Sequence, residues 1–159
     1  MVNRNNIRML RDGLGKFATG VTVVTCQGHT GPIGITANSF SSVSLEPPLI
    51  SWNIAKVSRS LQAFLDADHF AVNVLASDQE SLSVHFAQAN RPPFDDIGHE
   101  ISPSGVPLLA DTLACFECRT HEIHDCGDHH IIVGEVENHV FKEGRPLVFF
   151  AGNYACLDR

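Results

Sequence analysis

The sequence predicts a single domain dominated by β-strands, folded as a closed or split antiparallel barrel with a few short helices. Most of its apolar runs are short and rich in β-branched residues, which is typical of strands. Gly, Pro and polar residues separate these runs at short intervals, as turns do. Most connections are too short for the helical crossovers that parallel strands require. An antiparallel barrel satisfies all three observations.

Composition fits this class. The 159 residues are 43% hydrophobic and 18% charged, which suits one folded domain spanning residues 1–159. A net charge of -7 without a basic stretch argues against a nucleic-acid partner. The start carries no apolar stretch of signal-peptide length, and no run approaches the ~20 apolar residues that span a bilayer. We therefore expect a cytoplasmic protein without membrane contact, whose five cysteines remain thiols, mostly in apolar positions.

The first half is expected to contain two helices and four strands. Apolar residues at helical spacing predict an amphipathic helix over residues 5–17; they are Ile7, Leu10, Leu14 and Phe17. Strands are predicted over 21–26 and 32–38, joined as a hairpin, and over 49–54 and 70–75. A second helix is expected to begin at Ser58 and to bury Leu61, Phe64 and Leu65.

The second half begins with a further helix start, where Ser77 and Glu80 have the spacing of a capping box. Residues 91–107 are rich in Pro, Gly and polar residues, so they are expected to form a long surface loop. Strands are predicted over 113–122, 129–140 and 146–150.

Residues 34–44 place small hydroxyl and amide side chains between apolar ones. A flat heteroaromatic ligand with amide-like edges, such as an isoalloxazine, needs a close backbone approach and a few directed hydrogen bonds. Ala37, Asn38 and Ser39 are able to supply them. The alternative is an ordinary strand end with turn-forming Ser and Asn.

Residues 51–60 combine a strand, a loop and a helix start with Ser58, Arg59 and Ser60. Hydroxyl and guanidinium donors beside a helix N-terminus favour a phosphate. Plain helix capping is the alternative for the serines. Farther along, Gly127 and Asp128 suit a hairpin bend that would present His129 at the barrel mouth. His129 is a candidate for binding a substrate amide or moving a proton, and otherwise is a solvated turn histidine.

Cysteines and histidines crowd together near the end of the sequence, which makes a metal site an alternative; they are Cys115, Cys118, His121, His124, Cys126, His129 and His130. Cys115 and Cys118 have zinc-like spacing, but on a strand an odd separation places them on opposite faces. We therefore expect no native metal site. The sequence also lacks the Gly-x-Ser-x-Gly, Walker and Gly-x-Gly-x-x-Gly motifs of hydrolases, P-loop enzymes and dinucleotide folds.

Taken together, these stretches resemble the flavin reductase family, the small reductase components of two-component flavin-dependent monooxygenases. The matching segments are residues 17–25, 34–49, 70–75, 127–129 with 132–136, 146–149 and 152–154. The long segment from Gly34 and the Gly127-Asp128-His129 triplet are the most specific.

The resemblance implies an FMN-binding split barrel of Greek-key type that works as a homodimer, with flavin near the subunit interface. It implies FMN or FAD as the flavin, NADH or NADPH as the hydride donor, and a flavin-dependent monooxygenase as a partner. His129 would face the nicotinamide and orient its carboxamide. The flavin-binding residues that it implies are Thr36, Ala37, Asn38, Ser39, Ser42, Ser51, Trp52, Asn53, Ser58, Arg59, Ser60, His85, Phe86, Ala87 and Tyr154.

Two departures from the family pattern leave the choice of nucleotides open. Val84 and His85 stand where basic residues are common, which leaves FMN against FAD undecided. Asn153 stands where Arg is common, which leaves NADH against NADPH undecided. The hypothesis is an NAD(P)H-dependent flavin reductase; the alternative is an FMN-binding module without nicotinamide oxidase activity.

Overall fold

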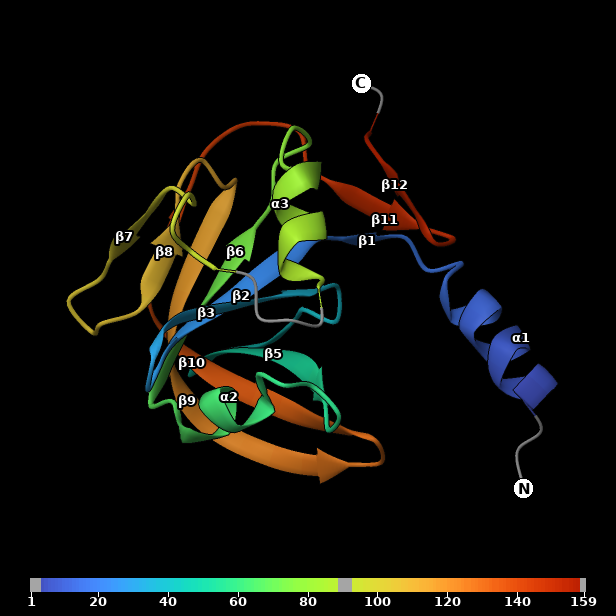
Figure 1. Ribbon diagram of the computed structural model, residues 1–159, viewed down its shortest axis with the longest axis horizontal. Helices are drawn as coiled ribbons and strands as arrows, with labels where there is room; N and C mark the ends of the chain where they lie inside the picture. Colours follow the sequence, from blue (N-terminus) through green and yellow to red (C-terminus); the bar gives the residue numbers. More distant parts are fainter. Residues whose placement is uncertain (1–3, 89–92, 158–159) are drawn as a thin grey trace.

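The computed structural model describes residues 4–88 and 93–157. Figure 1 shows a curled sheet with short helices around it. The helices are α1 (Arg4–Leu14), α2 (Leu61–Asp66) and α3 (Glu80–Phe86). The strands are β1 (Thr19–Gly20), β2 (Thr22–Gly28), β3 (Gly31–Ala37), β4 (Ser41–Leu45), β5 (Pro48–Ala55), β6 (His69–Val74), β7 (His99–Ile101), β8 (Pro107–Leu109), β9 (Ala114–Cys126), β10 (His129–Phe141), β11 (Val148–Phe150) and β12 (Asn153–Ala155).

Seven strands form one antiparallel sheet in the order β3-β2-β6-β9-β10-β5-β4. Four strands separate β3 from β5 in this order, yet the backbone N–H of Asn53 on β5 donates to Ser39 Oγ just after β3, at 2.9 Å. The sheet therefore curls until these two strands face each other across a gap that the ladder does not close. The predicted antiparallel split barrel is confirmed.

The barrel interior is filled mainly by aromatic and β-branched side chains. Trp52, Phe64 and Phe70 are almost fully buried there, and the rings of Trp52 and Phe64 meet edge to face with centroids 4.9 Å apart. Burying each such side chain contributes roughly 1.5–3 kcal/mol. Gly134 on β10 is required by this packing, because a Cβ there would lie 2.4 Å from the Phe70 ring. A second apolar cluster, around Val23, Leu75 and Phe86, lies under α3.

The predicted strands are present, with different ends. β9 and β10 run on to form a long hairpin of 13 residues a side. The region predicted as loop from 91 to 107 contains β7, which pairs with β8, although residues 91 and 92 lie outside the described residues. β4 and β12 were not predicted. β4 consists largely of serine, which is a poor strand former, but it pairs along β5.

The predicted helix starts were wrong in two places. Residues 58–60 form a turn, and α2 begins only at Leu61. α3 begins at Glu80 with Gln79 as its N-cap, so the capping box at Ser77 is not formed. Instead, Gln79 Oε1 accepts the Ala76 N–H at 3.0 Å, and the Ser77 N–H is taken by a carbonyl of the approaching C-terminal segment. A tertiary backbone contact thus replaced the local cap.

The first helix also differs from expectation. α1 ends at Leu14, three residues early, and stands off from the barrel in Figure 1. Its predicted apolar stripe faces solvent, with Leu14 66% exposed. Helices this short depend on tertiary packing for their stability, and within the protomer the apolar face of α1 is left exposed.

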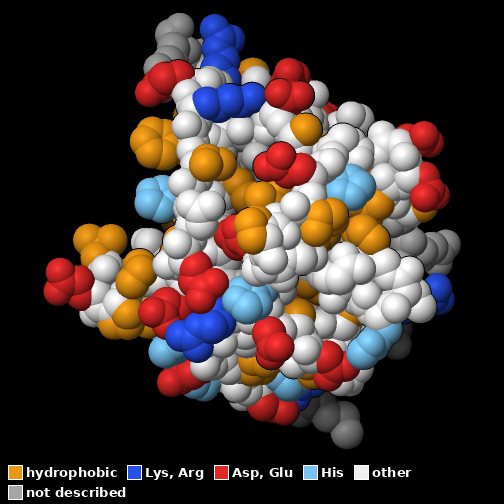
Figure 2. Space-filling model, turned by 90° about the vertical axis from the view of Figure 1, so that its left-hand side faces the viewer, with side chains coloured by type: hydrophobic (Ala, Val, Ile, Leu, Met, Phe, Trp, Pro, Cys, Tyr) orange, Lys and Arg blue, Asp and Glu red, His pale blue; other side chains and the backbone are white. Residues whose placement is uncertain are grey.

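Charge is distributed without a basic patch on the face shown in Figure 2, where the described acidic and histidine side chains lie among hydrophobic ones and Lys and Arg are sparse. Within the described residues, none of the helices has both the length and the apolar character required to cross a bilayer.

Candidate functional site

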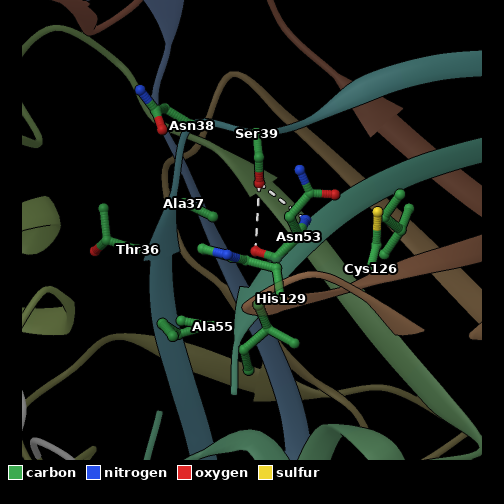
Figure 3. Close-up of a pocket in the computed structure, with 11 residues that line it drawn as sticks. Thr36, Ala37, Asn38, Ser39, Asn53, Ala55, Cys126 and His129 are labelled. Carbon is green, nitrogen blue, oxygen red and sulfur yellow. Dashed lines mark hydrogen bonds between the residues drawn. The ribbon is translucent and has the colours of Figure 1, made fainter. Parts of the chain in front are cut away.

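The split of the barrel holds a groove made of three adjoining cavities that all touch Thr36. The first cavity, of about 510 Å³, lies between β3, β5 and the tip of the β9–β10 hairpin. Figure 3 shows Thr36 and Ala37 on one side and Asn53 on the other, with His129 between Ala37 and Asn53. Its volume is within the range of small-molecule and cofactor sites.

The first cavity is open because Ser39 and Asn53 bridge the split only at its end. Besides accepting the Asn53 N–H, Ser39 Oγ donates to the Asn53 carbonyl at 3.4 Å. These two contacts fix the loop after β3 to β5, but β3 and β5 themselves are not paired as neighbouring strands of the sheet. The unpaired strand edges and the polar side chains of this region are therefore available to a ligand.

His129 reaches the cavity because of the hairpin bend. Gly127 has a φ of 63°, which favours glycine. His129, the first residue of β10, pairs with Cys126, the last residue of β9. The backbone N–H of Lys56 donates to the Asp128 carbonyl at 2.9 Å, which ties the bend to β5. His129 Nδ1 lies 2.6 Å from Asp128 Oδ1. The predicted hairpin bend is confirmed.

Two exposed carboxylates of this hairpin are held ionised by neighbours. The hydrogen bond with His129 is the main cause of the lowered pKa of Asp128, and the charge of Arg11 adds to it. Lys56 Nζ lies 2.6 Å from Asp125 Oδ1 and lowers the pKa of that carboxyl by hydrogen bonding and charge. Lys56, the lysine bound to this hairpin, is thus already ion-paired with Asp125.

The second cavity, of about 380 Å³, continues from the first through Ile35, Thr36 and Ala55. Its far end is lined by Val57, Ser58, Arg59, Ser60, Phe86, Ala87 and Gln88. Ser58 Oγ accepts the Ser60 N–H at 3.2 Å, which shapes the turn. Because α2 has six residues and starts after this turn, anion binding here would depend on the hydroxyl and guanidinium groups more than on a helix dipole.

The third cavity, of about 200 Å³, lies below the β11–β12 hairpin. Tyr154 Oη and Ser83 Oγ share a hydrogen bond of 2.7 Å, and Thr36 Oγ1 donates to the Ser83 carbonyl at 2.7 Å. Ser83 is fully buried. It therefore links α3, β3 and β12 at the groove wall. The sequence analysis missed it, although a serine on the apolar face of a helix was a usable signal.

The structure brings most of the predicted site residues together. Those that line the three cavities are Thr36, Ala37, Asn38, Ser39, Asn53, Ser58, Arg59, Ser60, Phe86, Ala87, His129 and Tyr154. Lining residues that were not predicted include Ile35, Cys126, Ile131, Val57 and Gln88. Most of these are apolar or lie in turns, where the sequence pattern carries no chemical signal.

Four predicted residues line none of these three cavities, and their place in the flavin site stays a prediction. The side chain of Trp52 is 0% exposed in the barrel core, because alternation along β5 turns it away from the face of Asn53. Ser42 and Ser51 lie along the β4–β5 ladder, away from the split. His85 Nε2 contacts the Pro93 carbonyl at 2.9 Å.

The cysteines carry no sign of metal chemistry. Cys115 packs with Ala71 and Val106, whereas Cys118 belongs to the barrel core, which confirms their predicted placement on opposite faces of the strand. Burial raises the pKa of each of these two thiols to about 12, so they do not ionise at neutral pH. The described residues contain no group of three or more His, Cys, Asp or Glu side chains placed to hold a metal ion.

Comparison with known proteins identifies the family of the chain. The model of the flavin reductase like domain matches residues 14–158. A protein named FMN reductase (NADH) SmoA from Agrobacterium fabrum is 51% identical over 97% of this chain and 88% of its own length. The reductase component of a flavin-dependent trigonelline monooxygenase from Acinetobacter baylyi is 44% identical over 94% of this chain, which spans 49% of that longer protein.

A solved structure is similar over nearly the whole fold. The NADH:FAD oxidoreductase SgcE6 of Streptomyces globisporus C-1027 superposes with a TM-score of 0.92 at 36% identity, covering 99% of this chain and 96% of that one. The same protein has been solved in complex with NAD and FAD fragments. The family model matches residues 14–158 and the relative from Agrobacterium covers 97% of this chain, and the chain belongs to the flavin reductase family.

Proposed function

We propose that this protein is an NADH-dependent flavin reductase that transfers hydride to FMN or FAD. One observation carries the proposal: the cavity at the end of β3 continues into the cavity at residues 58–60 through Ile35, Thr36 and Ala55. A ligand with a flat polar ring at one end and a phosphate at the other fits this continuity. The names of the relatives from Agrobacterium and Streptomyces support NADH as the donor.

The residues present suit a flavin chemically. Ala37, Asn38 and Ser39 line the first cavity, and their backbone and side-chain groups would be suitable partners for the donors and acceptors of an isoalloxazine edge. Ser58, Arg59 and Ser60 offer hydroxyl and guanidinium donors to a phosphate. Phe86, almost fully buried, forms an apolar wall of the second cavity.

When bound, the flavin supplies a ring nitrogen that accepts the hydride of the reduced nicotinamide. The protein's part is geometric. Asn38, Ser39 and Asn53, at the end of the split, would hold the ring edge and supply hydrogen-bond donors that stabilise negative charge on the reduced ring. His129, which pairs with Ala55 beside the first cavity, would orient the nicotinamide carboxamide. No proton transfer is required of His129 in this step, so it acts by positioning.

The working unit of this proposal is a homodimer. Exposed apolar side chains gather on α1, on the edge strand β4 and in the loop after β5, with Leu14 66%, Leu45 89% and Val57 93% exposed. Residues 1–17 also hold four of the 11 Lys and Arg residues but one of the 18 acidic residues. This basic, amphipathic arm suits the acidic barrel of a second copy.

The dimer is tested by light scattering. Leu10→Asp combined with Leu14→Asp should convert a dimer to a monomer, because both charges fall on the exposed apolar stripe of α1. Met9→Asp, also on α1 and 71% exposed but off the stripe, is the matched control and should leave the dimer intact. A wild-type monomer would contradict the proposal.

The reduced flavin produced here would be passed to a flavin-dependent monooxygenase. Two relatives support this role by name: the trigonelline monooxygenase reductase component, and the monooxygenase reductase subunit HsaB of Rhodococcus jostii, which is 38% identical over 95% of this chain and 78% of its own length.

The reductase activity is tested by adding NADH to the protein with FMN or FAD under anaerobic conditions and following the visible flavin band. Bleaching of the band supports a reductase, whereas flavin binding without bleaching would favour the FMN-binding module. His129→Ala should slow flavin reduction on the order of 10²-fold while sparing flavin affinity, since it disturbs only the approach of the nicotinamide. Weakened flavin binding at unchanged turnover would contradict this role of His129.

A further inference from the structure

The contact between Asp128 and His129 has a definite donor and a definite acceptor. His129 Nδ1 lies 2.6 Å from Asp128 Oδ1. The lowered pKa of Asp128 keeps its carboxyl ionised at neutral pH. An ionised carboxylate only accepts hydrogen bonds. The hydrogen of this bond therefore lies on His129 Nδ1.

The other ring nitrogen follows from this assignment. A neutral imidazole carries a single N–H, so a hydrogen on Nδ1 leaves Nε2 with a lone pair. The ring of His129 lies in the first cavity, facing Ala37 and Asn53, as Figure 3 shows. His129 thus presents a hydrogen-bond acceptor to a ligand in this cavity.

Building on the proposed reductase function, we infer that Asp128 is a positioning residue that holds His129 in the Nδ1–H tautomer. Together the two residues select reduced nicotinamide dinucleotides, which carry a carboxamide, against their nicotinic acid counterparts, which carry a carboxylate. The carboxamide NH₂ donates to Nε2. A carboxylate has no hydrogen to donate, so its oxygen lone pairs would face the lone pair of Nε2. The negative charge of Asp128 also repels the ligand carboxylate.

The charges around the bend leave this preference in place. Lys56 is the cation tied to the hairpin, and its Nζ is bonded to Asp125. Arg11 acts on Asp128 as a weaker, longer-range charge. The side chain of Asp128 is 96% exposed, so water screens its charge. Hydrogen-bond matching at Nε2 is accordingly the main source of selection.

The test compares kcat/KM for NADH with that for reduced nicotinic acid adenine dinucleotide at pH 8.5, above the range in which histidines ordinarily titrate. The wild type should prefer NADH by about 10–100-fold. Asp128→Asn should bring the two values within about 3-fold of each other, because an amide offers Nδ1 either an oxygen or an NH₂ and so admits both tautomers. Asp125→Asn makes the same charge change on the same hairpin and should keep the wild-type ratio.

A second readout needs no turnover. Nitrogen-15 NMR of the ligand-free wild type should show His129 as the Nδ1–H tautomer, and Asp128→Asn should show a mixture. An Nε2–H tautomer in the wild type, equal use of both dinucleotides, or an unchanged ratio in Asp128→Asn would each overturn the inference. Failure of the reductase proposal would instead appear as no oxidation of either dinucleotide, whatever the NMR result.

Discussion

Substitution of Gly34 should disturb the wall of the second cavity, which Gly34 and Phe86 both line. Gly34 lies on β3, and a Cβ at this position would lie 2.6 Å from Cε1 and 2.7 Å from Cδ1 of Phe86. Contacts this short force a displacement. The Phe86 ring is 1% exposed, and the ring of Phe94 packs behind it with centroids 5.0 Å apart. Gly34→Ala must therefore shift either the ring of Phe86 or the backbone of β3.

Overpacking of this kind costs about 1–3 kcal/mol of unfolding free energy. For a domain of this size that corresponds to a fall in Tm of roughly 3–10 °C. Because Phe86 and Gly34 both line the second cavity, the same displacement should weaken FMN binding by about 10-fold. Phe86→Leu removes the crowded ring atoms, so the double variant should recover part of the FMN affinity lost in Gly34→Ala.

Thermal unfolding and FMN fluorescence quenching measure the two effects. Gly20→Ala is the matched control, since nothing lies within 4 Å of a Cβ built there, and it should leave both quantities unchanged. A Gly34→Ala protein with wild-type Tm and wild-type FMN affinity would refute the packing of Phe86 against β3.

Three other predictions follow from burial and charge. Cys126 and Cys156 are exposed and should react readily with a thiol reagent at pH 8, whereas the three buried cysteines should react only after unfolding; rapid labelling of more than two thiols would contradict this. Lys56→Met should raise the pKa of Asp125 toward its ordinary value in an NMR titration, because the bond to Lys56 is the main cause that lowers it. Trp52, the single tryptophan, is 0% exposed, so its emission should resist quenching by acrylamide in the folded protein and become quenchable on unfolding.

Much of the barrel could be predicted because its strands are dictated locally. The β-branched run that forms β2 and the two runs that form β9 and β10 are strand-like whatever surrounds them. The ends of helices were less predictable, since the start of α3 is decided by a distant backbone carbonyl that occupies the Ser77 N–H. β4 was missed because its stability comes from pairing with β5 and not from the propensity of its serines.

The candidate site, like the fold, could be predicted only in part. Polar side chains next to turns, such as Asn38 and Ser58, were identifiable because their residue types suit ligand chemistry. The burial of the Trp52 side chain could not be predicted from the segment as a whole, because neighbouring residues of a strand point to opposite faces. Ser83 was missed because its role depends on a partner 71 residues away.

The central claim is that one flavin spans the groove, with its ring at the end of β3 and its phosphate at residues 58–60. The most direct test is the affinity of Arg59→Gln for FMN and for riboflavin, which lacks the phosphate, with Lys56→Gln as a neighbouring cation outside the second cavity. Arg59→Gln should weaken FMN binding about 10-fold and leave riboflavin binding unchanged, since a charge-assisted bond to phosphate is lost. Lys56→Gln should alter neither. Equal weakening of both ligands, or no effect on FMN, would contradict the claim.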